Sequence, residues 1–189
     1  MFFERKRGFS MRWLLIDRII DCEPGVKAVG QKTFPRSDMF FMDHFPGMPI
    51  VPGVLQIEMM AQVGGKCISI SRRDILPVLG TVKSAKFYRN VNPGDRCVIH
   101  ATVTKIAKSY STAEAYIEVD GVKVSSASIL FGHVERARLN SNDFDAVILD
   151  WQKRQKEKEL AAVSTSAQTS VAPAGAQTIA TTTSTEVSP

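Results

Sequence analysis

The segment formed by residues 53–71, GVLQIEMMAQVGGKCISIS, most constrains how this chain can fold. It combines helix-forming Leu, Gln, Glu, Met and Ala residues with apolar side chains on nearly every face, which is typical of a buried helix. A single helix of this kind needs a sheet that curls around it. Gly64 and Gly65 each weaken a helix by about 1 kcal/mol relative to alanine, which indicates either close approach of another backbone or a helix end there.

Strands are predicted on both sides of this helix. Turn residues bound the alternating segments, and Asp-Gly between two such segments is a strong hairpin signal. The predicted strands cover residues 13–20, 26–34, 79–88, 96–108, 111–119 and 122–131, and the predicted turns are Glu23-Pro24-Gly25, Asn92-Pro93-Gly94-Asp95 and Asp120-Gly121. The sequence therefore predicts an α+β fold, in which an antiparallel β-sheet wraps a long central helix.

The composition changes after residue 140. Asp143 can cap a helix whose apolar residues recur at helical spacing, namely Phe144, Val147, Ile148 and Trp151. A charged run follows, and from residue 164 the chain is rich in Ser, Thr and Ala. We predict a domain over residues 1–140, an amphipathic and charged helix over 141–163, and a disordered tail over 164–189.

Charge and hydropathy narrow the class of protein. No apolar run approaches the about 18–20 residues of a membrane span, and no signal-like segment follows the first residues, so we expect a cytoplasmic protein without a membrane span. The net charge of +5 is the sum of +7 over residues 1–140 and −2 over residues 141–189, and the basic first part favours an acidic protein partner. The basic residues are dispersed and accompany no recognition motif, so nucleic acid is not expected to bind.

The three cysteines, Cys22, Cys67 and Cys97, are odd in number and lack CxxC spacing. This pattern argues against a disulfide framework and against a thiolate metal site. We therefore expect buried free thiols, and we expect no metal or other cofactor.

A loop rich in proline and glycine, residues 36–52, leads into the buried helix. His44-Phe45-Pro46-Gly47 is predicted to be a pre-set turn, because proline fixes φ and glycine permits unusual φ values. A helix that begins at Gly53 presents backbone N–H groups without internal partners, which carry partial positive charge. Glu58 lies in the second turn of that helix, and Gln62 follows at i+4 on the same face.

These groups suit removal of a proton next to a carbonyl. The imidazole of His44 can act as a base, and backbone donors can hold a developing enolate oxygen. A carboxyl group in apolar surroundings favours its protonated form and can protonate a leaving hydroxyl. The set therefore predicts elimination of water from a 3-hydroxyacyl compound, with His100 and His133 interpreted as ordinary polar surface residues.

Residues 41–62, FMDHFPGMPIVPGVLQIEMMAQ, closely resemble the active-site segment of the FabZ-type β-hydroxyacyl-acyl-carrier-protein dehydratases. The resemblance runs from Trp13, through LLIDRIID and KFYRNVNPGD, to Phe131. It implies the hotdog fold and a hydro-lyase of fatty acid or related acyl-chain biosynthesis. The substrate would be a (3R)-3-hydroxyacyl chain on acyl carrier protein, and no cofactor would be needed.

The resemblance also implies roles for single residues. His44 corresponds to the base at the α-carbon and Glu58 to the acid toward the 3-hydroxyl, while the N–H of Gly53 corresponds to the donor to the thioester carbonyl. Gln62, beside the acid, and Phe45 are assigned to substrate binding. The family builds each site across a dimer interface, which implies a homodimer or a trimer of dimers. Candidate contacts to the acidic carrier are Arg72, Arg73, Lys83, Lys86 and Arg89.

Other functions stay open at this point. Related dehydratase-isomerases carry aspartate in place of Glu58, which favours plain dehydration, and the D-x-N-x-x-H arrangement of MaoC-type hydratases is not found. A hotdog acyl-thioesterase would use the carboxylate to direct water, and a non-catalytic acyl-binding or scaffold protein is a third alternative. The lead-in RGFSMRW departs from the family pattern, so acyl length and pathway stay open.

Overall fold

The computed structural model describes residues 13–138 and 146–169. The chain divides into two compact units, residues 1–153 and 154–189, which are described separately. Six strands and three α-helices make up the described part, with a short 3₁₀ turn (η1) at Arg136–Arg138. In chain order they are β1 (Arg18–Glu23), β2 (Lys27–Thr33), α1 (Phe40–Asp43), α2 (Gly53–Ser71), β3 (Ile75–Phe87), β4 (Arg96–Ile106), β5 (Tyr110–Val119), β6 (Val122–Glu135) and α3 (Ala146–Thr169).

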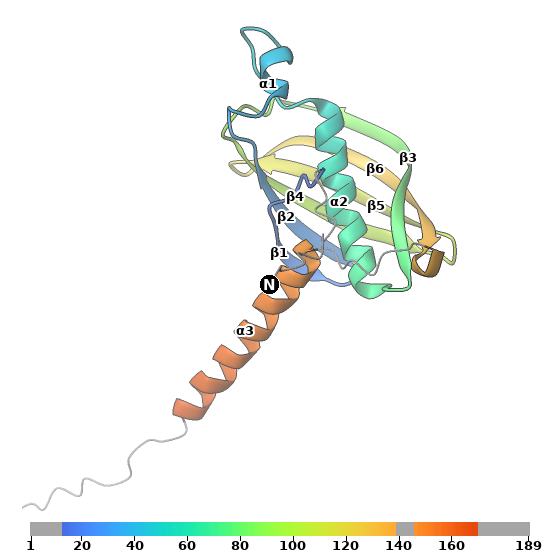
Figure 1. Cartoon of the computed structure of the whole chain (residues 1–189), viewed down its shortest axis with the longest axis vertical. Coiled ribbons are helices and arrows are strands. Elements are labelled where there is room, and N and C mark those ends of the chain that lie inside the picture. Colours follow the sequence, from blue (N-terminus) through green and yellow to red (C-terminus); the bar gives the residue numbers. More distant parts are fainter. Residues whose placement is uncertain (1–12, 139–145, 170–189) are drawn as a thin grey trace, which may run out of the picture. The chain divides into compact units, whose positions relative to one another are not determined.

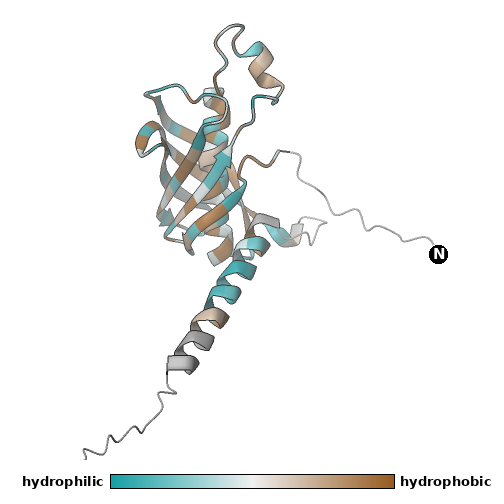
Figure 2. Ribbon diagram, turned by 90° about the vertical axis from the view of Figure 1, so that its left-hand side faces the viewer, coloured by the Kyte–Doolittle hydropathy of each residue, from teal (hydrophilic) through white to brown (hydrophobic). Residues whose placement is uncertain are grey.

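The six strands form one antiparallel sheet in the order β1-β2-β4-β5-β6-β3. The sheet curls around α2, as Figure 1 shows. Asp120 and Gly121, between β5 and β6, have φ values of 50° and 75°, as a tight hairpin turn requires. Hydrophobic and hydrophilic residues alternate along the strands (Figure 2), so one face of the sheet meets the helix. The predicted hotdog fold is confirmed.

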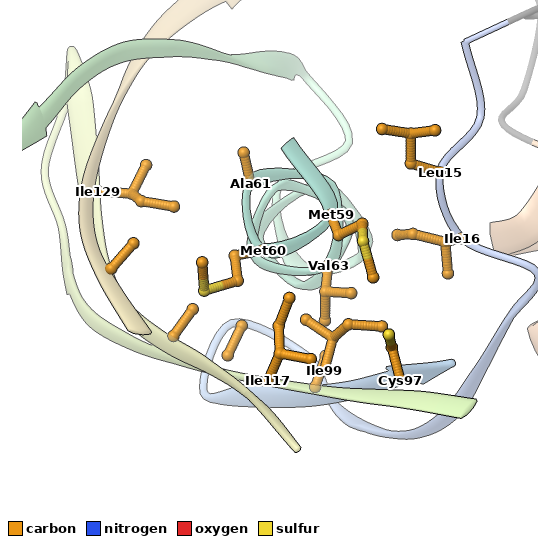
Figure 3. Close-up of a cluster of buried hydrophobic side chains, with 14 of the residues drawn as sticks. Leu15, Ile16, Met59, Met60, Ala61, Val63, Cys97, Ile99, Ile117 and Ile129 are labelled. Carbon is orange, nitrogen blue, oxygen red and sulfur yellow. The ribbon is translucent and has the colours of Figure 1, made fainter. Parts of the chain in front are cut away.

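The core lies between α2 and the concave face of the sheet. Met59, Met60 and Val63 are fully buried on α2. They meet strand residues that include Ile99 and Ile117 (Figure 3). The bounds of α2 are those predicted, and its burial follows from its apolar faces.

The glycine pair in α2 has a different neighbour from the one expected. A Cβ at Gly64 would lie 3.3 Å from Cζ of Phe131, so an aromatic side chain takes up the space. The expectation of a closely packed backbone was wrong at Gly64. At Gly65 the Phe131 ring is again the nearest group, 3.8 Å from such a Cβ, and the backbone oxygen of Pro77 follows at 4.0 Å.

Several strand boundaries differ from prediction: β1 ends at Glu23 and β6 at Glu135, three and four residues later than predicted, and two strand starts also differ. The chain becomes a strand only at Arg18 and not at Trp13, because the backbone of Trp13 and Leu15 bonds to the Gln62 side chain. β3 begins at Ile75 and runs through Pro77, which an edge strand tolerates because one side needs no donor. The short helix α1 interrupts the predicted loop.

The C-terminal helix α3 runs from Ala146 to Thr169. Ile148 is buried and Trp151 packs against the core, both within the first unit. The helix continues past its predicted end at residue 163, since a formed helix propagates readily through residues such as alanine. Asp143 and Phe144 of the predicted helix, and residues 170–189 of the predicted tail, lie outside the described residues, and the domain boundaries stay predictions. None of the described helices is long and apolar enough to cross a membrane.

Close packing between β2 and α2 leads to a stability prediction. A Cβ added at Gly30 would lie 2.6 Å from Cγ2 of Val63, which is fully buried, whereas one at Gly132 of β6 would meet nothing within 4 Å. We expect Gly30→Ala to lower the free energy of unfolding by about 1–3 kcal/mol, because overpacking forces the neighbours to shift. Gly132→Ala is the matched control. Denaturant unfolding of both variants checks this, and equal losses would contradict it.

Candidate active site

The His44 turn is held by its own backbone. The N–H of Phe45 donates to the carbonyl of Met48 at 3.0 Å, and the N–H of Met48 donates back to Phe45 at 2.9 Å. Gly47 has a φ of 80°, a value that glycine adopts without strain. The predicted turn is confirmed, and it protrudes with α1 beyond the sheet, at the end where α2 begins (Figure 1).

His44 lies at the C-terminal end of α1, and two contacts fix the orientation of its ring. Its Nδ1 is 3.2 Å from the carbonyl oxygen of Ile50, and its ring stacks on Phe45 with centroids 4.0 Å apart. A carbonyl can only accept, so Nδ1 carries the hydrogen. In the neutral ring this leaves Nε2 as the proton acceptor, with Phe45 supporting the ring.

Glu58 and Gln62 form a connected polar group on α2. The Nε2 of Gln62 donates to Glu58 Oε1 at 2.9 Å and to the Trp13 carbonyl at 2.8 Å, and its Oε1 accepts from the Leu15 N–H at 3.0 Å. All polar atoms of the amide are therefore engaged, and the donor end faces the half-buried carboxylate. The segment before β1 thereby fixes the orientation of Gln62, which in turn holds one oxygen of Glu58.

The N-terminus of α2 offers backbone donors. Pro52 is the N-cap residue, and its carbonyl accepts from the N–H groups of Leu55 and Gln56. The N–H groups of Gly53 and Val54 form none of the described backbone bonds outside the helices and strands. These groups are the first two of the helix and carry its partial positive charge.

An aromatic ring lies against this helix end. A Cβ at Gly53 would be 2.8 Å from Cζ of Phe87, the last residue of β3, whose side chain is 49% exposed. The absence of a side chain at Gly53 therefore lets the ring approach the N–H donors. Phe87 was not among the predicted site residues. Only its place in KFYRNVNPGD, distant in sequence, hinted at it.

The single chain does not join all predicted site residues. Gly53, Glu58 and Gln62 share α2, and Phe45 stacks on His44 in the loop. The hydrogen bonds of the described chain link His44 to Ile50 and Glu58 to Gln62, and none of them joins His44 to Glu58.

The other histidines have structural partners. His100 stacks on Tyr116, and its Nε2 is 3.5 Å from the carboxylate of Glu118. His133 Nε2 is 2.7 Å from Ser111 Oγ. Across residues 13–138 and 146–169, no three His, Cys, Asp or Glu side chains gather so as to hold a metal ion.

Comparison with known proteins identifies the family. Residues 10–128, more than half of the chain, match the FabA-like domain. The chain belongs to the FabA-like domain family. The match spans both the loop with His44 and the whole of α2, so the family assignment covers every element of the candidate site.

Two curated relatives of this FabA-like chain share one name. A 3-hydroxyacyl-[acyl-carrier-protein] dehydratase FabZ of Clostridium acetobutylicum is 41% identical over 120 residues, which cover 62% of this chain and 85% of the relative. The protein of the same name from Brucella ovis is 42% identical over 120 residues, covering 62% and 76%.

Solved structures support the fold alone. A conserved protein of Pseudomonas aeruginosa superposes with a TM-score of 0.54 at 16% identity, over 69% of this chain and 99% of that one. The PaaI protein from the phenylacetic acid degradation operon of E. coli gives 0.51 at 15% identity, over 61% and 78%. The FabA-like chain shares its hotdog architecture with proteins of very different sequence.

Two glutamines of α2 allow a matched test of the Gln62 hydrogen bonds. Gln62→Leu removes three bonds and leaves backbone groups of Trp13 and Leu15 unpaired, which we expect to lower the free energy of unfolding by about 1–3 kcal/mol. Gln56→Leu removes one bond, to Val51, together with a buried oxygen that has no partner, and should cost less. Denaturant unfolding compares them, and a larger loss for Gln56→Leu would refute this interpretation.

Proposed function

We propose that this chain is a 3-hydroxyacyl-[acyl-carrier-protein] dehydratase, which converts (3R)-3-hydroxyacyl thioesters to trans-2-enoyl thioesters. The observation that carries the proposal is the placement on one helix of a donor terminus at Gly53 and an amide-held carboxyl at Glu58. The oriented His44 supplies the base. The names of relatives that are 41–42% identical support the same reaction.

The geometry suggests a role for each group in the reaction. Nε2 of His44 removes a proton from the α-carbon, and the N–H of Gly53 stabilises the negative charge that develops on the thioester oxygen. Glu58 protonates the 3-hydroxyl, which leaves as water while the C2–C3 double bond forms. Because Gln62 holds Oε1 of Glu58, the other carboxyl oxygen is available to the hydroxyl.

Apolar side chains near these groups suit an acyl chain. Phe45 is 48% exposed beside the His44 ring, and Phe87 lies against Gly53. The two rings can contact substrate on either side of the thioester position, so we keep Phe45 as a substrate-binding residue and add Phe87. Their exposure in the single chain leaves apolar area that substrate or a second subunit can cover.

We further propose that the active unit is a homodimer with shared sites. β3 is a long strand at the edge of the described sheet, where it pairs with β6, and much of it is exposed. Such an edge is a template for pairing with another chain. Pairing of two β3 strands would let the His44 loop of one subunit meet the α2 helix of the other, which would supply the contact between His44 and Glu58 that one chain lacks.

The basic residues on and near β3 complement the negative charge of an acyl carrier protein. Lys83, Lys86 and Arg89 are exposed on and just after this strand. The guanidinium of Arg72, in contrast, donates twice to the carboxylate of Asp74, at 2.8 and 2.7 Å. This pair lowers the pKa of Asp74 to about 2. Of the candidate contacts, we therefore favour the three near β3 over Arg72.

One assay distinguishes a dehydratase from a thioesterase and from a binding or scaffold protein. The purified chain is incubated with 3-hydroxyacyl-carrier-protein substrates of several acyl lengths, and the mass of the acylated carrier is measured over time. A dehydratase produces carrier whose acyl chain has lost water, a thioesterase releases the acid and leaves free carrier, and a binding or scaffold protein leaves the substrate unchanged. Absence of enoyl product at every length would overturn the proposal.

The role of His44 predicts a large loss of turnover. We expect His44→Ala to lower kcat by about 10²–10⁴-fold, because a general base typically contributes that much. His100→Ala is the matched control, since that ring stacks on Tyr116 within the sheet, and it should retain most activity. Circular dichroism verifies that both variants fold. Activity of His44→Ala within threefold of the unmodified chain would contradict the assignment.

Shared sites predict complementation. His44→Ala and Glu58→Ala are each expected to be inactive, but a mixed dimer has one site with both lesions and one with neither. Random reassortment makes about half of the dimers mixed, so about a quarter of full activity should return by symmetry. Co-expression with two different tags allows the mixed dimers to be purified and assayed, and after purification about half of full activity is expected, because one site of two is intact. Mixed dimers without activity would show that the two residues act within one chain.

A further inference from the structure

Three residues, Ile50-Val51-Pro52, connect the His44 turn to the start of α2, and we call this segment the strap. Its first residue binds His44 twice. The carbonyl oxygen of Ile50 lies 3.2 Å from Nδ1 of the ring, and the N–H of Ile50 donates to the His44 carbonyl at 3.0 Å. The orientation of the proposed base therefore depends on where the strap lies.

The other backbone polar groups of the strap are also engaged. The N–H of Val51 donates to the Val91 carbonyl at 2.8 Å, and the Pro52 carbonyl accepts from N–H groups of the first turn of α2. Pro52 itself has no N–H. The remaining group, the carbonyl of Val51, accepts from Nε2 of Gln56 at 3.2 Å. Apart from His44, Gln56 is thus the one side chain that binds the strap in the described hydrogen bonds.

The burial of Gln56 sets it apart from the other polar residues of the site. It is 3% exposed, whereas Glu58 and Gln62 are half-buried. Its Oε1 is also buried and has no hydrogen-bond partner among the described residues. A buried amide that is only partly paired costs free energy, which a single hydrogen bond offsets in part. Stability alone would therefore favour an apolar side chain of the same length, and the bond to the strap is the feature that accounts for an amide.

We propose that Gln56 is a positioning residue, which acts through the strap to keep His44 in the orientation and tautomer that proton removal requires. This role rests on the proposed dehydratase function and adds to its site a residue that does not touch the substrate. While the strap carbonyl binds Nδ1–H, the neutral ring keeps Nε2 as its proton acceptor. A ring that loses this bond is free to move its hydrogen to Nε2, where it no longer serves as the base.

Two adjacent peptide groups couple Gln56 to the ring. The oxygen that binds His44 belongs to the peptide group before Val51, and the oxygen that binds Gln56 belongs to the group after it. Val51 precedes a proline, which restricts it to extended conformations, so the two groups move together. Without Gln56, the carbonyl of Val51, a residue that is 2% exposed, would be a buried acceptor without its donor. Rotation of the strap toward another donor would then move the Ile50 oxygen away from Nδ1.

The kinetic test compares two variants of the full chain. Gln56→Met keeps the length and approximate volume of the side chain but has no N–H donor. We expect it to lower kcat by about 10–100-fold, because a small misplacement of a catalytic group has effects of this size. KM should change by less than about threefold, since no contact to substrate is lost. Ile68→Val is the matched control, because Ile68 is fully buried near the other end of α2, and it should retain kcat.

A second measurement reports on the ring itself. Nitrogen-15 NMR of histidine-labelled protein, at a pH where the rings are neutral, distinguishes the Nδ1–H tautomer from the Nε2–H tautomer, and His44→Ala identifies the signals of His44. We expect the Nδ1–H tautomer in the unmodified chain and a mixture of both in Gln56→Met. Ile68→Val should match the unmodified chain. Because no substrate is needed, this comparison decides the role of Gln56 even if the chain forms no enoyl product and the dehydratase proposal fails.

The outcomes separate positioning from packing. Lower kcat with a mixed tautomer, and with little change in the free energy of unfolding, supports the proposal. A kcat of Gln56→Met within threefold of the unmodified chain would overturn it, as would an unchanged His44 tautomer. An Nε2–H tautomer in the unmodified chain would do the same. If Gln56→Met fails to fold, Gln56→Leu undergoes both measurements with the same expectations.

Discussion

Burial of the apolar side chains of α2 is the constraint on which the rest of the structure depends. A helix that is apolar on most of its surface is covered by a sheet that bends around it, which the antiparallel strands achieve. The helix keeps polar groups at the half-buried Glu58 and Gln62 and at its ends. One end, at Gly53, brings free backbone donors next to the loop that carries His44. The candidate site is therefore a consequence of how the core is covered.

Glu58 and Gln62, the polar pair of α2, lie beside the segment that precedes β1. Trp13 and Leu15 run alongside the helix before β1 begins, and their backbone groups satisfy the amide of Gln62. The carboxylate of Glu58 then receives a hydrogen bond from the same amide. A polar pair within an apolar helix is tolerated because every atom of the amide has a partner. Because this segment is not a strand, its backbone groups bond to Gln62, and Gln62 in turn positions Glu58.

Much of this arrangement follows from local sequence. The run of helix-forming and apolar residues predicted the bounds of α2, and proline, glycine and Asp-Gly marked the turns, because these signals act over a few residues. The starts of β1 and β3 depend on bonds to distant partners, Gln62 and β6, and were misplaced. For the same reason, the ring of Phe87 against Gly53 was not foreseen.

The order of elements along the chain has a consequence for synthesis. α2 is complete before β3 to β6 exist, and β3 pairs with β6 through partners as distant as Ile75 and Glu135. A nascent chain therefore exposes its most apolar helix until the last strand has emerged. Such non-local pairing slows folding and leaves apolar surface open to aggregation in the meantime. This chain should thus depend on chaperones during translation more than a helical bundle of equal length.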